Sequence, residues 1–426
     1  MNEQQLFHLD PRLIERAEKA LASSQNIFEK IDTVRAQNQL KVLAAFRDQG
    51  VGTAHLVGST GYGYDDTGRD ALDRVFAQIF GAEAALVRAN FMSGTHTIST
   101  ALTALLRPGD CMVSLTGTPY DTLHAVIGLH RKKGDGSLLD LGVRYREIPL
   151  GADALPDLDA IRTACRENIQ MAYIQRSRGY SLRPSLTQEQ TRAVIEAVRS
   201  VNEQVPIVVD NCYCEFVETK EPTDYGADLA IGSLIKNAGG GIARTGGYIV
   251  GRQDLVERCA DRLCYVGVGR EIGCTLDMNR ELFLGLFMAP QTVSNAVKTA
   301  VFAARLFADL GFEVTPSADQ TRADIVQCLL LKNRERLCAF CRGIQSASPV
   351  DAHVLPEPAP MPGYESDVIM AAGAFTLGAS IELSADAPLR DPYAVFVQGA
   401  LTFDAGRIGL LSAAQSLLDA GMLTLE

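Results

Sequence analysis

The chain has 426 residues, 47% of them hydrophobic and 21% charged, so it is long enough for two or three globular domains and is neither disordered nor fibrous. Its formal net charge is −11 and no basic block stands out, which disfavours a nucleic-acid partner. Ten scattered cysteines, a start without signal-peptide layout and apolar runs that polar residues interrupt indicate a cytoplasmic protein without a membrane span.

The first predicted element is an N-terminal helical arm, assigned to residues 1–52. Leu13, Ala17 and Ala20 recur at helical spacing, and glycine and proline are rare between residues 10 and 50. A glycine-rich segment follows at residues 58–66. Its backbone-permissive composition predicts a loop rather than a helix or a central strand.

A large α/β domain is predicted over residues 53–290. Short β-prone runs alternate there with helical segments, which predicts a mostly parallel, seven-stranded sheet with helices on both faces. The runs are 84–87, 111–115, 143–148, 171–175, 206–210, 229–232 and 248–250. Ligands bind at the carboxyl ends of such strands, so the residues that end each run are the candidates for function.

A smaller α+β domain is predicted over residues 291–426. A long helical pattern after residue 277 leads out of the sheet domain. The expected features that follow are strands at 325–331 and 379–383, a proline-rich loop at 356–362 and a terminal helix from about residue 405.

The first strand-end feature is the turn Ser93-Gly94-Thr95, between a β-prone run and a helical segment. Free backbone N–H groups and the helix dipole make such a turn suitable for an anion. The alternative is an ordinary capped helix with Ser93 or Thr95 as N-cap.

The second and third features are an acid and an amine. Asp210 ends an apolar run, although an aspartate in this position is often only a turn former. Lys236 ends another apolar run and precedes three glycines, an approach that favours the uncharged amine that a nucleophile requires. The alternative for Lys236 is a solvated loop lysine. Ser233, three residues earlier, carries a hydroxyl that could contact a phosphate bound near the lysine.

An anion site, an acid and an amine at strand ends match the needs of pyridoxal 5'-phosphate. The phosphate binds the helix start, the aldehyde bonds to Lys236, and Asp210 keeps the pyridine nitrogen protonated. Tyr120 follows another strand and is expected to stack on the ring.

These residues resemble those of fold-type-I pyridoxal-phosphate enzymes of cysteine and methionine metabolism, specifically the methionine γ-lyase-like proteins often labelled aluminium resistance proteins. The resemblance extends from the loop near residue 58 to the segment 379–400, and its most specific pieces are residues 208–214 and 233–236. It implies an aspartate aminotransferase-like fold. It also implies these roles: Asp210 on the pyridine nitrogen, Ser233 and the turn Ser93-Gly94-Thr95 on the phosphate, Lys236 bonded to the cofactor, and Tyr120 over the ring.

The early loop departs from the family pattern. Typical γ-lyases carry a tyrosine and an arginine two residues apart that reach the partner subunit's phosphate, whereas Tyr62, Tyr64 and Arg69 are spaced differently here. Tyr62 is assigned to the cofactor phosphate. Tyr64, with Tyr120, is assigned to protonation of the leaving group. Which early-loop residue crosses the dimer stays open.

Two arginines are candidates for the substrate carboxylate. Arg178 and its neighbour Arg176 follow a strand end, where an ion pair within the loop is an equally good interpretation. Arg390 follows a β-prone run in the smaller domain, and its alternative is an ion pair with Asp386 or Asp391.

The expected activity is β- or γ-elimination on an L-amino acid by a carbon–sulfur lyase, giving a 2-oxo acid and ammonia. The alternatives are γ-replacement, elimination on a non-sulfur amino acid such as a halogenated one, and a cofactor-binding regulator without turnover. The resemblance also implies a homodimer or homotetramer with shared active sites.

Two other site classes are disfavoured by the sequence. A nicotinamide-binding Rossmann domain requires a G-x-G-x-x-G turn with an acid about 20 residues later, and no strand here is followed by one. No metal is expected, because neither Cys212/Cys214 nor Cys338/Cys341 has a second pair or a histidine at ligand spacing.

Overall fold

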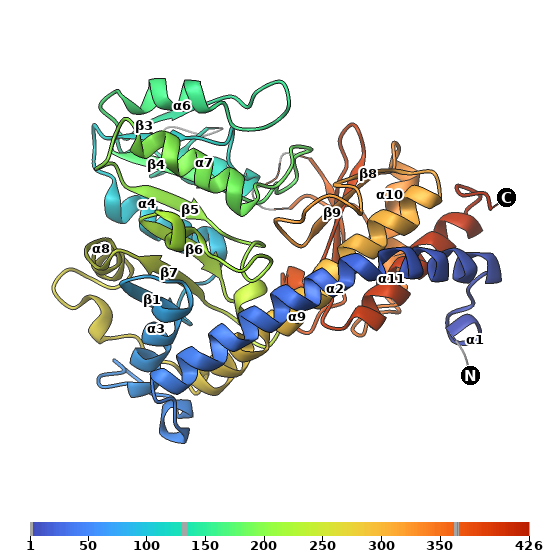
Figure 1. Ribbon diagram of the computed structural model, residues 1–426, viewed down its shortest axis with the longest axis horizontal. Coiled ribbons are helices and arrows are strands. Elements are labelled where there is room, and N and C mark those ends of the chain that lie inside the picture. Colours follow the sequence, from blue (N-terminus) through green and yellow to red (C-terminus); the bar gives the residue numbers. More distant parts are fainter. Residues whose placement is uncertain (1–2, 130–133, 362–363, 365, 426) are drawn as a thin grey trace. The chain divides into compact units, whose positions relative to one another are not determined.

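The computed structural model describes residues 3–129, 134–361, 364 and 366–425 (Figure 1). These residues form two compact units, one of residues 37–289 and one of residues 1–36 with 290–426. Two long helices, α2 (Pro11–Asp48) and α9 (Asn279–Asp309), contribute residues to both units. Among the described residues, no helix combines the length and the apolar character needed to cross a membrane.

The unit of residues 37–289 is built on a seven-stranded sheet in the order β1-β7-β6-β5-β4-β2-β3. All neighbouring pairs are parallel except those that involve β7, so the prediction of a mostly parallel sheet is confirmed. All seven predicted strands are present. They are β1 (Ala84–Arg88), β2 (Cys111–Ser114), β3 (Arg144–Glu147), β4 (Met171–Gln175), β5 (Ile207–Asp210), β6 (Leu229–Ser233) and β7 (Gly247–Gly251).

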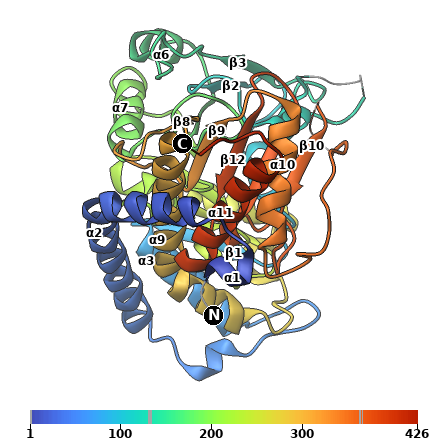
Figure 2. The same cartoon turned by 90° about the vertical axis from the view of Figure 1, so that its right-hand side faces the viewer.

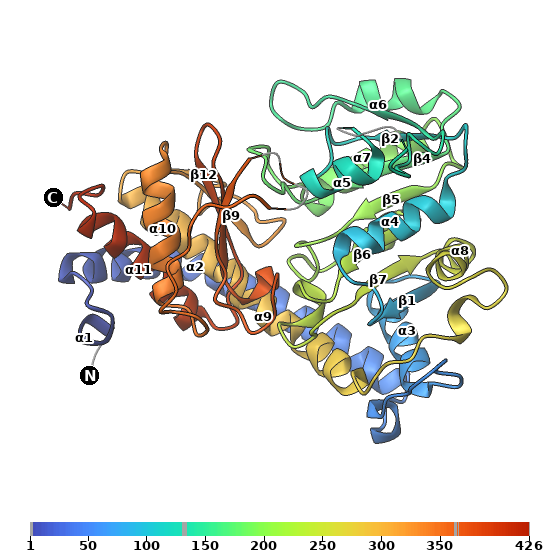
Figure 3. The same ribbon diagram turned by 180° about the vertical axis from the view of Figure 1, so that it is seen from behind.

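Helices cover both faces of this sheet. Helices α4 (Gly94–Leu105) and α8 (Gln253–Leu263) pack on one face, where Ile98 and Val256 share a core with Val208, and Figure 3 shows α4 across β5 and β6. Helices α6 (Leu158–Cys165) and α7 (Gln188–Arg199) pack on the other face. The remaining elements of the unit are α3 (Thr67–Ile79), α5 (Asp121–Ile127), η1 (Thr53–Leu56), η2 (Pro222–Tyr225), η3 (Asn237–Gly239) and η4 (Gly269–Glu271).

The other unit contains a five-stranded antiparallel sheet in the order β10-β11-β12-β9-β8. Its helices α10 (Arg334–Ser346) and α11 (Phe403–Asp419) share a core with the strands (Figure 2). The strands are β8 (Glu313–Thr315), β9 (Val326–Leu330), β10 (Val368–Ala371), β11 (Ser384–Pro388) and β12 (Ala394–Gln398), and the short helices are α1 (Glu3–Phe7) and η5 (Ser380–Glu382).

One predicted strand of this unit is wrong. Residues 379–383 contain the 3-10 helix η5, and β11 begins only at Ser384. The carboxylate of Glu382 accepts hydrogen bonds from the backbone N–H groups of Phe375 and Thr376, and Leu383 has a φ of 86°. The hydrogen bonds of Glu382 and the positive φ of Leu383 change the chain direction just before β11. The predicted proline-rich loop is a loop in its described part, while Pro362 lies outside the described residues.

A buried ion cluster joins α3 to the edge strand β1. The Asp73 carboxylate accepts two hydrogen bonds from Arg88 Nη1, at 2.9 and 3.0 Å, and one from the Val87 N–H at 2.7 Å. The side chains of Asp73 and Arg88 are each only 1% exposed. Arg270 Nη2 also lies 3.3 Å from Asp73 Oδ2. Loss of one partner would therefore leave uncompensated charge in the protein interior.

Replacement of Asp73 by alanine is expected to lower the free energy of unfolding by about 3–5 kcal/mol, because Arg88 would stay buried without its carboxylate. Urea denaturation followed by circular dichroism measures this. The control is Asp159→Ala, whose exposed pair with Arg162 contributes about 0–1 kcal/mol. Equal losses in the two variants would contradict the expectation.

Candidate active site

Asp210 occupies the carboxyl end of β5, beside β6, where its backbone pairs with Ile231. The residue is 7% exposed, and its carboxylate accepts hydrogen bonds from the Cys212 N–H at 3.1 Å and from the Tyr173 hydroxyl at 3.4 Å. Burial raises the pKa of Asp210, although the Cys212 N–H and the charge of Lys236 act in the opposite direction. A cation bound beside this carboxylate would therefore stabilise its charged form.

The predicted anion turn is the N-terminus of α4. Ser93 is its N-cap and accepts a hydrogen bond from the His96 N–H at 3.1 Å, so the capped-helix interpretation also holds. A Cβ atom added to Gly94 would lie 3.4 Å from both Ser233 Cβ and Cys212 Sγ. The structure thus brings this turn next to the ends of β5 and β6. The Thr95 hydroxyl lies 2.8 Å from that of Thr122.

Ser233 is fully buried at the end of β6, and its hydroxyl has no hydrogen-bond partner among the described residues. Such atoms are rare in folded proteins, because burial without a partner costs about 1–3 kcal/mol. This hydroxyl lies beside the N-terminus of α4, which favours anions. A phosphate group between them would satisfy both, so the residues fit the expected cofactor.

Lys236 follows β6 and is half-buried, so its surroundings are less closed than the sequence indicated. Its Nζ donates a hydrogen bond to the Tyr213 hydroxyl at 2.5 Å and lies 4.1 Å from the centre of the Tyr213 ring. The sequence analysis did not single out Tyr213. Tyr213 lies three residues after Asp210, in the segment 208–214 that carries the family resemblance, and this position could have identified it as a candidate site residue.

Tyr120 is half-buried at the start of α5. Its ring packs edge-on against Tyr180 with centroids 5.5 Å apart, and its backbone N–H donates to Gln175 Oε1 at 2.7 Å. A Cβ atom on Gly179 would lie 2.8 Å from Tyr120 Cδ2, so glycine is required there. The loop after β4 therefore supports the Tyr120 ring from one side.

Side-chain hydrogen bonds fix the base of the glycine-rich loop at residues 58–66, while two tyrosine side chains at its tip are exposed. Arg69, buried at 2% exposure, donates to the carbonyl of Gly63 at 2.7 Å, and Asp66 accepts a hydrogen bond from Thr275 Oγ1 at 2.6 Å. Arg69 therefore stabilises the loop of its own subunit. Tyr62 and Tyr64 stack on each other at 5.4 Å and are 64% and 62% exposed. Among the described residues, neither tyrosine side chain forms a hydrogen bond or a ring contact with Lys236.

The arginines after β4 have different environments. Arg176 is fully buried and forms an ion pair with Glu218 at 2.7 Å, in agreement with the ion-pair interpretation. Arg178 is also buried, and its backbone N–H donates to Ser185 Oγ at 3.0 Å.

The other candidate for the substrate carboxylate, Arg390, belongs to the other unit. It lies in the exposed connection between β11 and β12, where its backbone N–H donates to the Pro388 carbonyl at 2.9 Å.

The sequence analysis also missed a buried acid behind the site. Glu215 is fully buried and accepts a hydrogen bond from the Tyr248 hydroxyl at 2.7 Å. Burial raises the pKa of Glu215 to about 8. A Cβ atom on Gly232 would lie 2.4 Å from Glu215 Oε1, so glycine at this point of β6 makes room for the carboxyl group. No pattern in the sequence indicates this contact.

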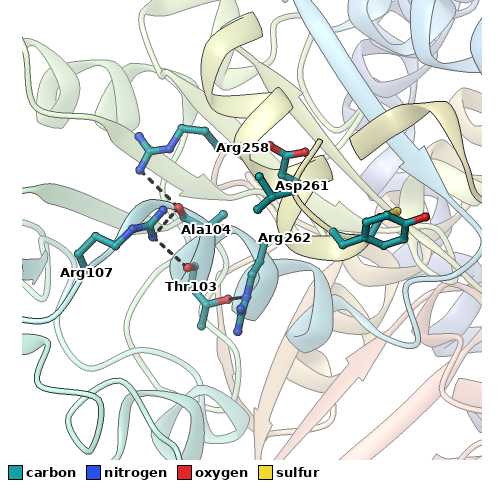
Figure 4. A pocket seen from close by; sticks show the side chains of 9 residues that line it. Thr103, Ala104, Arg107, Arg258, Asp261 and Arg262 are labelled. Carbon is teal, nitrogen blue, oxygen red and sulfur yellow. Dashed lines mark hydrogen bonds between the residues drawn. The ribbon is translucent and has the colours of Figure 1, made fainter. Parts of the chain in front are cut away.

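An arginine-rich pocket of about 550 Å³ lies at the other end of α4, roughly 18 Å from Gly94 for a helix of 12 residues (Figure 4). Arg107 Nη1 donates to the Ala104 carbonyl at 2.9 Å, and Arg258 Nη2 donates to the Leu105 carbonyl at 3.1 Å. Arginines suit a helix C-terminus, whose carbonyls lack helical partners and carry partial negative charge. We therefore assign these arginines a structural role, the binding of the free carbonyl groups at the C-terminus of α4.

Residues 12–418 match the sequence profile of the family described as methionine gamma-lyase. A Clostridium acetobutylicum protein, described as a candidate cystathionine beta-lyase involved in aluminum resistance, is 46% identical, with 97% of each chain covered and a TM-score of 0.94. A carbon-sulfur lyase involved in aluminum resistance from Clostridium novyi is 44% identical, with 97% of this chain and 98% of that chain covered and a TM-score of 0.93. The pyridoxal-5'-phosphate dependent protein YhfS from Escherichia coli shares the fold alone, at 17% identity and a TM-score of 0.62 over 91% of this chain and 97% of that chain.

Proposed function

The chain belongs to the methionine gamma-lyase family, and from this we propose that it is a pyridoxal-phosphate-dependent lyase that breaks a carbon–sulfur bond of an L-amino acid. Its fold is that of fold-type-I pyridoxal-phosphate enzymes. The main support for this proposal is the buried hydroxyl of Ser233, which has no hydrogen-bond partner in the described part of the chain and lies next to the N-terminus of α4, on the segment that leads to Lys236.

We assign the cofactor's phosphate to Ser233 and to the turn Ser93-Gly94-Thr95. Asp210 would hold the proton of the pyridine nitrogen, and Tyr120 would cover the ring. When bound, pyridoxal phosphate supplies an aldehyde that bonds to amines and a ring that accepts the electron pair left by a departing proton.

Replacement of Ser233 by alanine is expected to weaken cofactor binding about 10- to 100-fold, because a hydrogen bond to a charged group contributes about 1.5–3 kcal/mol. Titration of the cofactor-free protein, followed by absorbance, measures the dissociation constant. Ser24→Ala is the control, since that buried hydroxyl donates to the Ala20 carbonyl within α2. Unchanged affinity in the Ser233 variant would remove this serine from the phosphate site.

The proposed chemistry assigns proton transfer to Lys236 and the tyrosines, and substrate binding to an arginine. Lys236 would take the proton from the substrate α-carbon, and for γ-elimination also one from the β-carbon. Tyr120 or Tyr64 would protonate the leaving group. Arg178 or Arg390 would bind the substrate carboxylate, because a guanidinium group forms paired hydrogen bonds with it.

β-Elimination is the first reaction to test, because the 46% identical relative is described as a candidate cystathionine beta-lyase. Assays with cystathionine, cysteine, methionine and halogenated amino acids, in which the 2-oxo acid and ammonia are identified, separate β- from γ-elimination. A γ-replaced amino acid as product would indicate the transferase alternative. Lack of turnover on all sulfur substrates by a cofactor-loaded preparation would refute the lyase proposal.

A homodimer or homotetramer with shared active sites completes this proposal. The exposed pair Tyr62 and Tyr64 stands on a loop whose base is fixed by Asp66 and Arg69. Such a loop presents the two exposed tyrosine side chains at a defined position. We propose that Tyr62 contacts the cofactor phosphate of a partner subunit and that Tyr64 contributes to its catalytic site.

A further inference from the structure

The segment after β5 holds a tyrosine against the reactive lysine. The Tyr213 hydroxyl accepts a hydrogen bond from Lys236 Nζ at 2.5 Å, and the same nitrogen lies 4.1 Å from the centre of the ring. A hydroxyl lone pair and the face of an aromatic ring both stabilise a protonated amine more than a neutral one. The two contacts therefore act in the same direction on one atom.

The backbone at Tyr213 is left-handed, with a φ of 72°. A non-glycine residue pays free energy for this conformation, which persists only where the surrounding structure enforces it and which is frequent at active sites. Here the Cys214 N–H donates to the Asn211 carbonyl at 3.0 Å, and Asn38 Nδ2 donates to the Phe216 carbonyl at 3.0 Å. The loop is thus fixed on both sides of the tyrosine.

The loop that carries the lysine is joined to the same segment. Asn237, the residue after Lys236, donates from Nδ2 to the Glu215 carbonyl at 3.1 Å. The contact between Tyr213 and Lys236 is therefore set by backbone positions on both sides. Such an arrangement orients the amine rather than merely filling space beside it.

We propose that Tyr213 is a positioning residue for Lys236: it holds the Nζ atom in place and raises its affinity for a proton whenever the amine is not bonded to the cofactor. The inference rests on the proposed function, in which Lys236 is the base. A base with higher proton affinity removes a substrate proton more readily. The charge of Lys236 also acts on the ionisable groups of Asp210 and Cys212, which lie in the same segment as Tyr213.

The test compares Tyr213→Phe, which removes only the hydroxyl, with Tyr213→Leu, which removes the ring as well. The matched control is Tyr225→Phe, because the buried Tyr225 hydroxyl has no hydrogen-bond partner among the described residues. The cofactor-free proteins are treated with trace acetic anhydride at a series of pH values, and acetylation of Lys236 is measured by peptide mass spectrometry.

We expect Lys236 to be acetylated about three- to tenfold faster in Tyr213→Phe below its protonation midpoint, which corresponds to a midpoint lower by about 0.5–1 pH unit. Tyr213→Leu should show a larger change, and Tyr225→Phe none. The same midpoint in Tyr213→Phe and in the unaltered protein would overturn the proposal, whether or not the protein is a lyase. Thermal melting identifies a variant that has lost its fold.

A second measurement uses the cofactor-loaded enzyme. The acid limb of the pH profile of kcat should move to lower pH in Tyr213→Phe, with kcat reduced more than KM is changed. A structural role alone would lower activity without moving this limb. If no substrate turns over, the proposed function fails, while the acetylation midpoint still decides the role of Tyr213.

Discussion

Replacement of Lys236 by alanine is expected to lower kcat at least about 10⁴-fold, because in the proposed mechanism Lys236 is both the amine that bonds to the cofactor and the base that removes the substrate proton. These losses act on the same steps, so they do not add as independent effects. Elimination is measured by release of the 2-oxo acid at saturating substrate and cofactor.

The control for this experiment is Lys220→Ala, which removes an exposed lysine of the same unit. Borohydride reduction of the loaded protein should add the mass of the reduced cofactor to the peptide that contains Lys236, and the Lys236 variant should not gain it. Retained elimination in Lys236→Ala, or a cofactor mass on another lysine, would contradict the assignment.

Most of the sheet could be predicted because six of its seven strands are buried and mainly apolar, whereas the edge strand β3 is largely exposed. The proximity of Asp210 and Ser233 could also be predicted. These residues end β5 and β6, and neighbouring parallel strands end at the same edge of a sheet. Their proximity to Gly94 depends on how α4 crosses the sheet, and the alternation of strands and helices already constrains that crossing.

The contacts of the loops could not be predicted. Tyr213 reaches Lys236 because its backbone has a positive φ, a conformation that residue type indicates only for glycine and, less strongly, for asparagine and aspartate. Arg69 was a candidate for the partner subunit but donates to the Gly63 carbonyl of its own loop and to the Gly273 carbonyl of the same chain. Side-chain direction in a loop depends on backbone angles that neither periodicity nor composition encodes.

Replacement of Asp210 by asparagine is expected to lower kcat/KM about 10²–10⁴-fold, since we propose that the buried Asp210 pairs with the protonated pyridine nitrogen and loss of one member of a buried charge pair costs about 3–5 kcal/mol. Asparagine keeps the shape of the side chain but no longer favours a proton on the pyridine nitrogen. Asp159→Asn is the control, because the Asp159 side chain is 94% exposed. Activity within threefold of the unaltered enzyme would show that no carboxylate is needed at this position.

The same substitution should have the opposite effect on the cofactor-free protein. Burial raises the pKa of Asp210 in the folded state, so the folded protein binds more protons than the unfolded chain between the ordinary carboxyl pKa and the raised one. Stability therefore falls as the pH rises through that window. Asp210→Asn removes this contribution, so above the window the cofactor-free variant should unfold at a higher urea concentration than the unaltered protein. A variant less stable at neutral pH would mean that the ionised carboxylate stabilises the cofactor-free protein, and the presence of a charge at this position would then need no cofactor to explain it.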